Sequence, residues 1–203
     1  MSRDERERWD HRYASGDYTP RTQPTPFLVD WLDRILAART GDRRALDVAT
    51  GTGRNALAMA EAGFEVDAID VSEVALDRAR AEAERRGLEV NWVVGDLDDG
   101  ALPHDSYDLI TVIRYRNPDL WPRLRAALAP DGWILVEHHL RTDREDVAGP
   151  GDDRFRLEPG ELLEVFADLR VVHYSESVEP ADMGDGPLFV IARFVACAGD
   201  PGW

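Results

Sequence analysis

Two glycines and an acidic residue lie close together in the segment 45–56, where their types and spacing could bind a ligand. An apolar run that reads as a buried strand ends at Asp47, and Gly51 and Gly53 follow before the start of a helix. Glycines at these positions allow positive φ and remove the Cβ atoms that would block a close approach. The pattern predicts a turn whose backbone holds a nucleotide-like molecule at a helix N-terminus.

Two more acidic residues stand at the ends of predicted strands. Asp70 closes the segment 64–70, about twenty residues after Gly51, where a carboxylate can accept both ribose hydroxyls. Asp96 follows the segment 90–95 and could accept a hydrogen bond from an adenine amino group. Three predicted strands thus end in three carboxylates, and ligands bind at the carboxyl ends of parallel strands.

The glycine spacing has two interpretations. Gly51-x-Gly53-x-x-Ala56 with a later acid also fits the fingerprint of a dinucleotide-binding enzyme. A dinucleotide-binding strand usually runs apolar into its first glycine, whereas Asp47 stands four residues before Gly51 here. This carboxylate favours a ligand with a cationic amino-acid group, and a nicotinamide-dependent oxidoreductase stays as the alternative.

The segment 46–136 resembles the class I S-adenosylmethionine-dependent methyltransferases. Their first motif is an acid followed by small residues alternating with glycine, and it corresponds here to 47–53, with Ala49 where the family more often has glycine. The resemblance extends to Asp70 and to the segment 95–97. It implies an α/β fold, a doubly wound and mostly parallel seven-stranded sheet of the Rossmann-like type with a C-terminal antiparallel hairpin.

The same resemblance implies the cofactor S-adenosyl-L-methionine and the residues that bind it. The glycine loop would hold the amino-acid part of the cofactor, Asp70 the ribose, Asp96 the adenine amine, and Val71 or Leu97 the adenine face. The residues expected at this cofactor site are Asp47, Ala49, Gly51, Gly53, Asn55, Asp70, Val71, Asp96, Leu97 and Ile113.

Methyl transfer from a sulfonium is an in-line displacement, in which positioning supplies roughly 7 to 11 kcal/mol and a general base is optional. If a base is present, it should project from the ends of strands four and five, which gives Arg114, Tyr115, His138 and His139 as candidates, with His138 favoured of the two histidines. His138 and His139 are adjacent in the chain and should point to opposite faces of the sheet. His138 is also interpretable as a solvated loop residue, and the pair does not predict a metal site.

Arginines near these candidates allow another kind of recognition. Arg114, Arg116, Arg154 and Arg156 could recognise an anionic substrate, although exposed arginines are common on protein surfaces. The residue types leave the acceptor atom open. A protein that binds the cofactor without turnover also remains an alternative, because no clear base is present.

Composition narrows the expected partners. The 203 residues carry a formal net charge of −16, with 40 acids against 24 basic residues that are all arginine. Such a charge opposes binding to a phosphate backbone, so we expect a small-molecule substrate and no nucleic acid. The N-terminus is charged and no run reaches membrane-spanning length, which predicts no membrane association. The single cysteine, Cys197, fits a buried position in a cytoplasmic protein, and the oligomeric state stays open.

Strands and helices alternate from residue 44 onward, as a parallel sheet requires. Strands are expected at about 45–47, 64–70, 89–94, 107–113 and 133–137, and helices at 54–62, 72–86 and 120–129. The stretch 138–158 reads as a surface loop, and 159–161 opens a further helix. The runs 169–177 and 188–196 have no helix between them and should pair antiparallel.

The N-terminal segment precedes this alternating core. Residues 3–14 read as a charged helix with Trp9 and Tyr13 on one face. This aromatic pair could close over a cofactor or pack on the domain. We expect one methyltransferase domain, 1–203, composed of an N-terminal helical lid segment at 1–40 and a Rossmann-like core at 44–203.

Overall fold

A computed structural model describes residues 3–16, 18–38, 43–98, 102–104, 106–180 and 186–201, with side chains from residue 5 onward. The elements follow one another as α1 (Arg3–Ser15), α2 (Pro26–Ala37), β1 (Arg44–Val48), α3 (Arg54–Glu61), β2 (Glu65–Asp70), α4 (Glu73–Arg86), β3 (Asn91–Val94), β4 (Tyr107–Ile113), η1 (Pro118–Leu120), α5 (Trp121–Ala126), β5 (Leu128–His139), η2 (Asp153–Phe155), α6 (Glu161–Val165), β6 (Arg170–Pro180) and β7 (Leu188–Cys197).

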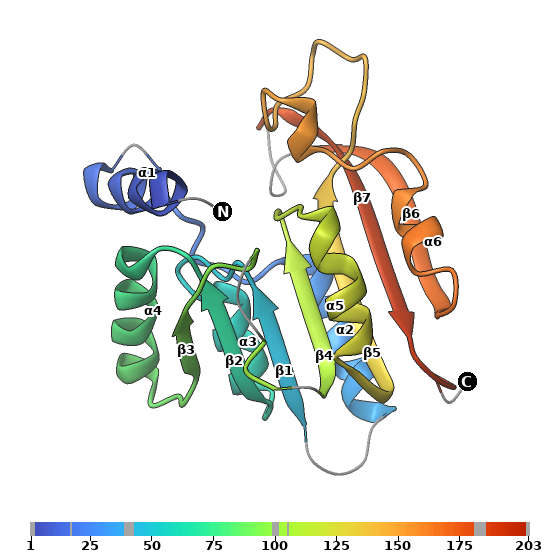
Figure 1. The fold of residues 1–203 in the computed structure, drawn as a ribbon, viewed down its shortest axis with the longest axis horizontal. Helices are drawn as coiled ribbons and strands as arrows, with labels where there is room; N and C mark the ends of the chain where they lie inside the picture. The colour runs from blue at the N-terminus through green and yellow to red at the C-terminus, as the bar shows by residue number, and fades with distance from the viewer. Residues whose placement is uncertain are drawn as a thin grey trace.

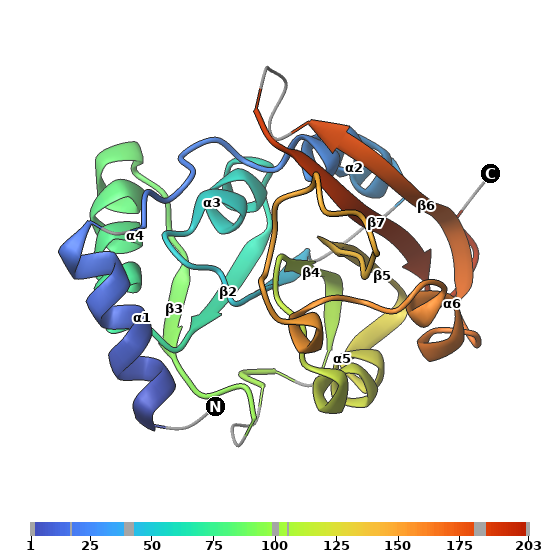
Figure 2. The same ribbon diagram turned by 90° about the horizontal axis from the view of Figure 1, so that it is seen from above.

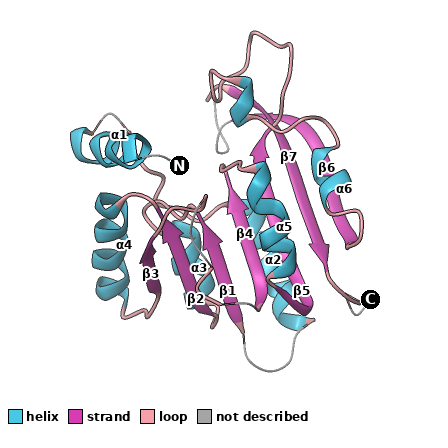
Figure 3. Ribbon diagram, viewed as in Figure 1, coloured by secondary structure: helices cyan, strands magenta, loops and turns pink. Residues whose placement is uncertain are grey.

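The strands form one seven-stranded sheet in the order β3-β2-β1-β4-β5-β7-β6 (Figures 1 and 3). β1 to β5 are parallel, whereas β7 is antiparallel to both β5 and β6. The predicted fold class is confirmed, including the antiparallel hairpin at the end of the sheet. The carboxyl ends of the parallel strands all lie at the upper edge of the sheet in Figure 1.

Helices cover both faces of the sheet. α2 and α3 pack on one face and α5 and α6 on the other, as the view along the strands in Figure 2 shows. The central strand β4 is buried along its whole length, which accounts for its continuous apolar sequence. Segments of α/β alternation therefore fold into a layer of strands between two layers of helices.

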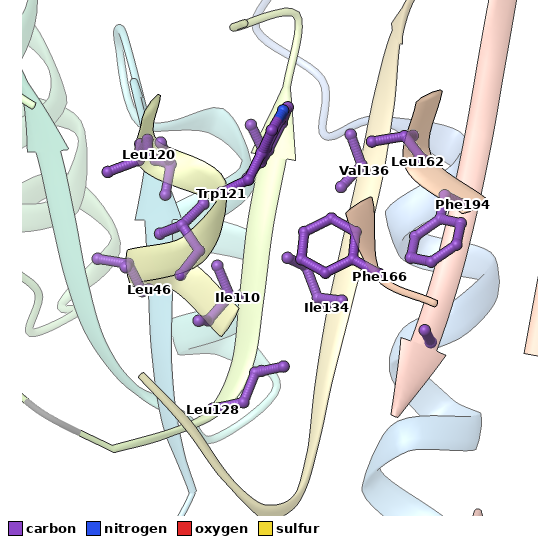
Figure 4. Packing of buried hydrophobic residues seen from close by; sticks show 14 of the residues in the cluster. Leu46, Ile110, Leu120, Trp121, Leu128, Ile134, Val136, Leu162, Phe166 and Phe194 are labelled. Atoms are coloured by element: carbon purple, nitrogen blue, oxygen red, sulfur yellow. The ribbon is translucent and has the colours of Figure 1, made fainter. Parts of the chain in front are cut away.

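Aromatic side chains fill the interface between the sheet and the helices α5 and α6. Trp121 at the start of α5 and Phe166 after α6 are fully buried, with ring centroids 5.9 Å apart (Figure 4). Phe166 also stacks on Phe194 of β7, at 5.5 Å. These contacts fix the last antiparallel strands against the same core as β4 and β5.

The start of β5 differs from the prediction. The sequence predicts a strand from Trp133 after a turn, whereas β5 already begins at Leu128. Tyr107 pairs with Leu128 and Leu109 pairs with Trp133, so the residues between these two pairs bulge from the sheet, with φ +62° at Asp131. The turn-forming residues thus mark a bulge inside the strand rather than its beginning.

The end of β5 also differs from the prediction. The strand continues through His138 and His139, which pair with Ala192 and Ile191 of β7. His138 is only 2% exposed, so its interpretation as a solvated loop residue is wrong. The following segment, predicted as a surface loop, folds back on the sheet through a bridge between Leu140 and Leu157.

The helices of the described ranges are all too short or too polar to cross a lipid bilayer.

Candidate functional site

The strand order places a ligand site between β1 and β4. The chain proceeds from β1 to β2 and β3 on one side, then returns to β4 on the other side. Ligands of open α/β sheets bind at such a switch point, outside the carboxyl ends of the strands. The segment after β1, the end of β2 and the residues that follow β4 therefore define the candidate site.

The loop after β1 has three residues in the left-handed region. Ala49, Gly51 and Gly53 have φ of 54°, 58° and 79°. A Cβ atom on Gly53 would lie 2.6 Å from a ring carbon of Trp92, so only glycine fits between the loop and β3. A Cβ atom on Gly51 would lie 2.9 Å from the Tyr13 hydroxyl. Ala49 adopts the same backbone region at a strain cost of about 1 to 3 kcal/mol.

Asp47 lies beneath this loop and supports it. Its carboxylate accepts hydrogen bonds from the hydroxyls of Thr50, at 2.5 Å, and Thr111, at 2.7 Å. Burial raises the pKa of Asp47 to about 6, against the lowering effect of these two hydroxyls. The side chain thus joins the loop to β4, and its contribution to cofactor binding stays a prediction.

Asp70 faces the same loop from the end of β2. One carboxylate oxygen accepts the Gly51 N–H at 2.7 Å, and the other accepts the Ser72 N–H at 2.9 Å. Burial raises the pKa of Asp70, and these backbone hydrogen bonds oppose the shift. Each carboxylate oxygen can accept a further donor. The residues present fit a ribose, since a buried carboxylate stands beside Gly51, which has no Cβ atom.

The helix α1 docks over this edge of the sheet, beside α4 (Figures 1 and 2). Asp10 accepts a hydrogen bond from the hydroxyl of Ser72, the N-cap of α4, at 2.6 Å. Arg78 donates to the carbonyl of Tyr13 at 2.6 Å, and Tyr13 is 6% exposed. Ser72 is recognisable as a cap from sequence, but no local pattern predicts Asp10 as its partner.

The other predicted cofactor residues occupy different surroundings. Val71 and Leu97 are buried, and Asp96 is half-buried and accepts the Asp98 N–H at 2.9 Å. Asn55 accepts the Thr25 N–H at 2.9 Å and so ties α3 to the segment before α2. Ile113 lies in the core beneath α2 and α3. The structure brings Gly51, Asp70 and the start of α4 together, whereas Asn55 and Ile113 serve the interior.

The residues that follow β4 separate the glycine loop from the end of β5. Arg114 has φ +61° and pairs with the buried carboxylate of Glu137 at 3.1 Å. Its guanidinium lies 3.1 Å from Nε2 of His139 and 5.4 Å from the ring centre of Phe189. Burial raises the pKa of Tyr115 to about 12, with contributions from the charges of residues 5, 70 and 96. Tyr115 therefore lies on the side of Asp70 and Asp96, whereas Arg114 lies on the side of β5.

The two histidines at the end of β5 lie on opposite faces, as alternation along a strand requires. His138 lies 2.7 Å from the Phe155 carbonyl through Nε2, so this nitrogen carries the proton and donates. Burial lowers the pKa of His138 to about 4, and its Nδ1 has no partner among the described residues. Burial and Arg114 lower the pKa of His139 to about 2. Both rings are neutral at physiological pH.

Metal binding finds no support in the described part of the chain. Groups of three or more histidine, cysteine, aspartate or glutamate side chains that could hold an ion are absent from those residues.

The geometry places the glycine loop and the Asp70 carboxylate at the switch point of a Rossmann-like sheet. Residues 45–132 match a family model described as a methyltransferase domain. The ribosomal protein L11 methyltransferase of Symbiobacterium thermophilum is 32% identical over 75% of this chain and 49% of its own length. The ubiquinone biosynthesis O-methyltransferase of Bordetella avium is 30% identical over 63% of this chain and 54% of its own.

Solved structures show the same fold. TehB from Haemophilus influenzae matches with a TM-score of 0.73 at 20% identity, covering 93% of this chain and 66% of that one. A protein titled for converting a disulfide into a thioacetal in echinomycin biosynthesis matches with a TM-score of 0.71 at 19% identity, covering 95% and 92%.

These matches support a class I S-adenosylmethionine-dependent methyltransferase, with S-adenosyl-L-methionine as the cofactor. The chain spans about half the length of the curated relatives it matches. The match to a methyltransferase domain covers residues 45–132 and does not identify the acceptor.

Proposed function

We propose that this protein transfers the methyl group of S-adenosyl-L-methionine to a small-molecule acceptor. The observation that carries the proposal is the hydrogen bond from the Gly51 N–H to Asp70, which joins the glycine loop to the carboxylate of the neighbouring strand. When bound, the cofactor supplies an electrophilic methyl group on a sulfonium. The protein contributes alignment of the acceptor with that group and exclusion of water.

In this proposal each part of the cofactor has its own residues. The segment 49–53 holds the amino-acid part, and Asp70 accepts the ribose hydroxyls. Asp96 accepts the adenine amine, with Val71 and Leu97 against the adenine. Support comes from the burial of Asp70 and of both apolar side chains at this edge.

A small acceptor is favoured by the cover that the chain itself forms over the end of β5. Residues 140–157 return to the sheet through the bridges from Leu140 to Leu157 and from Val147 to Leu188. A Cβ atom on Gly149 would lie 3.0 Å from Nδ1 of His139, so this segment lies directly on the strand end. A covered site suits a small molecule better than a macromolecule. The buried Cys197 agrees with a reducing compartment such as the cytoplasm.

The names of relatives do not decide the acceptor. Among the curated relatives, one name refers to a ribosomal protein and another to ubiquinone biosynthesis. A solved structure of this fold is titled a [4+2]-cyclase, at 19% identity and a TM-score of 0.63, so the fold alone does not fix the reaction.

Calorimetry and a labelled-methyl assay test the proposal together. We expect S-adenosylmethionine and S-adenosylhomocysteine to bind and nicotinamide dinucleotides not to bind. Transfer of label to acceptors in a small-molecule extract distinguishes an enzyme from a protein that only holds the cofactor. Absence of binding by both adenosyl compounds would contradict the proposal.

A further inference from the structure

The carboxyl edge of the sheet has an acidic side and a basic side. Asp70, Asp96 and Asp10 lie around the glycine loop and α4, where a cationic cofactor would bind. On the side of β5 and β7, guanidinium groups gather around His139 and Glu137. We refer to Arg114, Arg156 and Arg193 as the arginine cluster. This local positive charge stands against a net charge of −16 for the whole chain.

A buried carboxylate organises the cluster. Glu137 of β5 is 3% exposed and pairs with Arg114 at 3.1 Å and with Arg193 at 2.8 Å. Arg193 also pairs with Glu179 at 2.6 Å. One buried carboxylate thus bridges two guanidiniums, and Arg114 keeps a left-handed backbone, φ +61°, to reach it. A side chain held this way is fixed in position before any ligand arrives.

Arg156 brings a further guanidinium to the same place from the covering segment. It donates to the carbonyls of Pro150 and Leu140 at 3.0 and 3.2 Å, and its side chain is 11% exposed. The carboxylate of Asp153 lies 3.9 Å away, and that side chain is 57% exposed. A Cβ atom added to Gly149 would lie 3.0 Å from the His139 ring and 3.3 Å from the Arg156 guanidinium. The side chains of His139 and Arg156 therefore meet beneath the covering segment.

Nearby guanidinium groups lower the pKa of both histidines at the end of β5. Burial is the main cause of the low pKa of His139. The charges of Arg114, Arg156 and Arg21 and the neighbouring His138 lower this pKa further. For His138 the corresponding charges are those of Arg114, Arg116 and Arg156. The same guanidiniums would stabilise an anion placed beside them.

The two histidines at the strand end are poorly placed to take a proton from an acceptor. Nε2 of His138 donates to the Phe155 carbonyl, and Nδ1 is shielded from solvent. His139 faces the Arg114 guanidinium at 3.1 Å. An effective general base needs a pKa near the working pH, whereas these rings have pKa values of about 4 and about 2.

We propose that the methyl acceptor reaches this site as a small anion, ionised at the nucleophilic atom, and that the arginine cluster orients it. The inference rests on the proposed function. A lone pair of the acceptor forms the bond to the methyl carbon while the carbon–sulfur bond breaks and its electron pair stays on sulfur. The charges of the sulfonium and the anion cancel, and no proton has to leave. An acceptor that is neutral and protonated would instead need a base.

Matched acceptors test this inference directly. Each pair combines a molecule ionised near neutral pH with a neutral one of similar shape, such as benzoate with benzamide and a thiophenolate with the corresponding phenol. Formation of S-adenosylhomocysteine is measured for wild type, Arg156→Met and Arg156→Lys. Arg144→Met is the control, because Arg144 lies in the same covering segment, is 45% exposed and pairs locally with Asp146.

We expect kcat/KM to favour the ionised member of a pair by at least about tenfold. Arg156→Met should lower kcat/KM for the anion roughly 10- to 100-fold, as expected for loss of a charged partner. Arg156→Lys should restore part of the loss, and Arg144→Met should have no effect. Affinity for S-adenosylmethionine should be the same in all variants.

Several results would overturn the inference. These are equal or better turnover of neutral acceptors, an equal loss for both members of a pair, or no turnover of any anion by protein that binds the cofactor. A pH profile with an inflection that disappears in His138→Gln would show a protein base and contradict it as well. Failure to bind either adenosyl compound would instead refute the proposed function.

Discussion

Asp47 should make the stability of this protein fall as pH rises from about 4 to 6. Burial beneath the glycine loop raises the pKa of its carboxyl from 3.8 to about 6 in the folded state. The folded chain therefore holds a proton that the unfolded chain has released within this range. Stability falls wherever the folded state binds more protons, and a difference of about two pH units corresponds to on the order of 3 kcal/mol.

Asp47→Asn isolates this effect, because the amide keeps the shape and stays neutral at every pH. Its nitrogen and oxygen can still bond with the hydroxyls of Thr50 and Thr111. Below pH 4 both proteins carry a neutral group under the loop. Above pH 6 only wild type carries a buried charge, so the variant should gain on the order of 3 kcal/mol relative to wild type.

Urea unfolding at a series of pH values between about 4 and 7 measures the difference between the two proteins. Changes at all other carboxyl groups cancel in this difference. Asp77→Asn, on the exposed face of α4, is the control and should give a constant difference, since that side chain is 69% exposed. A constant difference for Asp47→Asn, or a gain of wild type with rising pH, would refute the reasoning.

Substitutions at three further positions test the loop, α1 and the covering segment. Ala49→Val should lower the free energy of unfolding by about 1 to 3 kcal/mol, because a β-branched residue is strained at φ 54°. Ala49→Gly should change this free energy by less than about 1 kcal/mol. Urea midpoints that rank the two variants otherwise would be contrary evidence. Asp10→Ala should lower the free energy of unfolding by about 0.5 to 2 kcal/mol and speed hydrogen exchange in α1, because it removes an acceptor from the start of α4. Unchanged exchange would show that α1 docks by other contacts. Gly149→Ala should lower turnover with unchanged cofactor affinity, because φ is +134° and the new Cβ atom would contact His139. Full turnover would show that the covering segment is not part of the acceptor site.

Local sequence patterns predicted most of the fold. The alternation of apolar runs and helical segments, with carboxylates at strand ends, gave the parallel sheet, and the runs at the C-terminus gave the hairpin. The beginning of β5 was missed because Pro130, Asp131 and Gly132 carry turn signals that the structure uses for a bulge. A turn before the strand and a bulge inside it use the same types of residue, and only the pairing of β5 with β4 distinguishes the two.

The candidate site was less predictable because its contacts join distant residues. Gly51 and Asp70 follow a known spacing, whereas Asp10 reaches Ser72 across 62 positions and Arg193 reaches Glu137 across 56. Neither pair has a local signature. A charged residue in a strand or helix reads as solvated until a partner in space is known.

The most direct test of the central claim is the dissociation constant of S-adenosylmethionine for wild type and Asp70→Ala, measured by calorimetry. Asp77→Ala serves as the control on the neighbouring helix, and unfolding midpoints establish that both variants are folded. We expect Asp70→Ala to weaken binding by about 1 to 3 kcal/mol, because a buried charged acceptor loses its hydrogen bonds to ribose. An unchanged dissociation constant would remove Asp70 from the site and contradict the account.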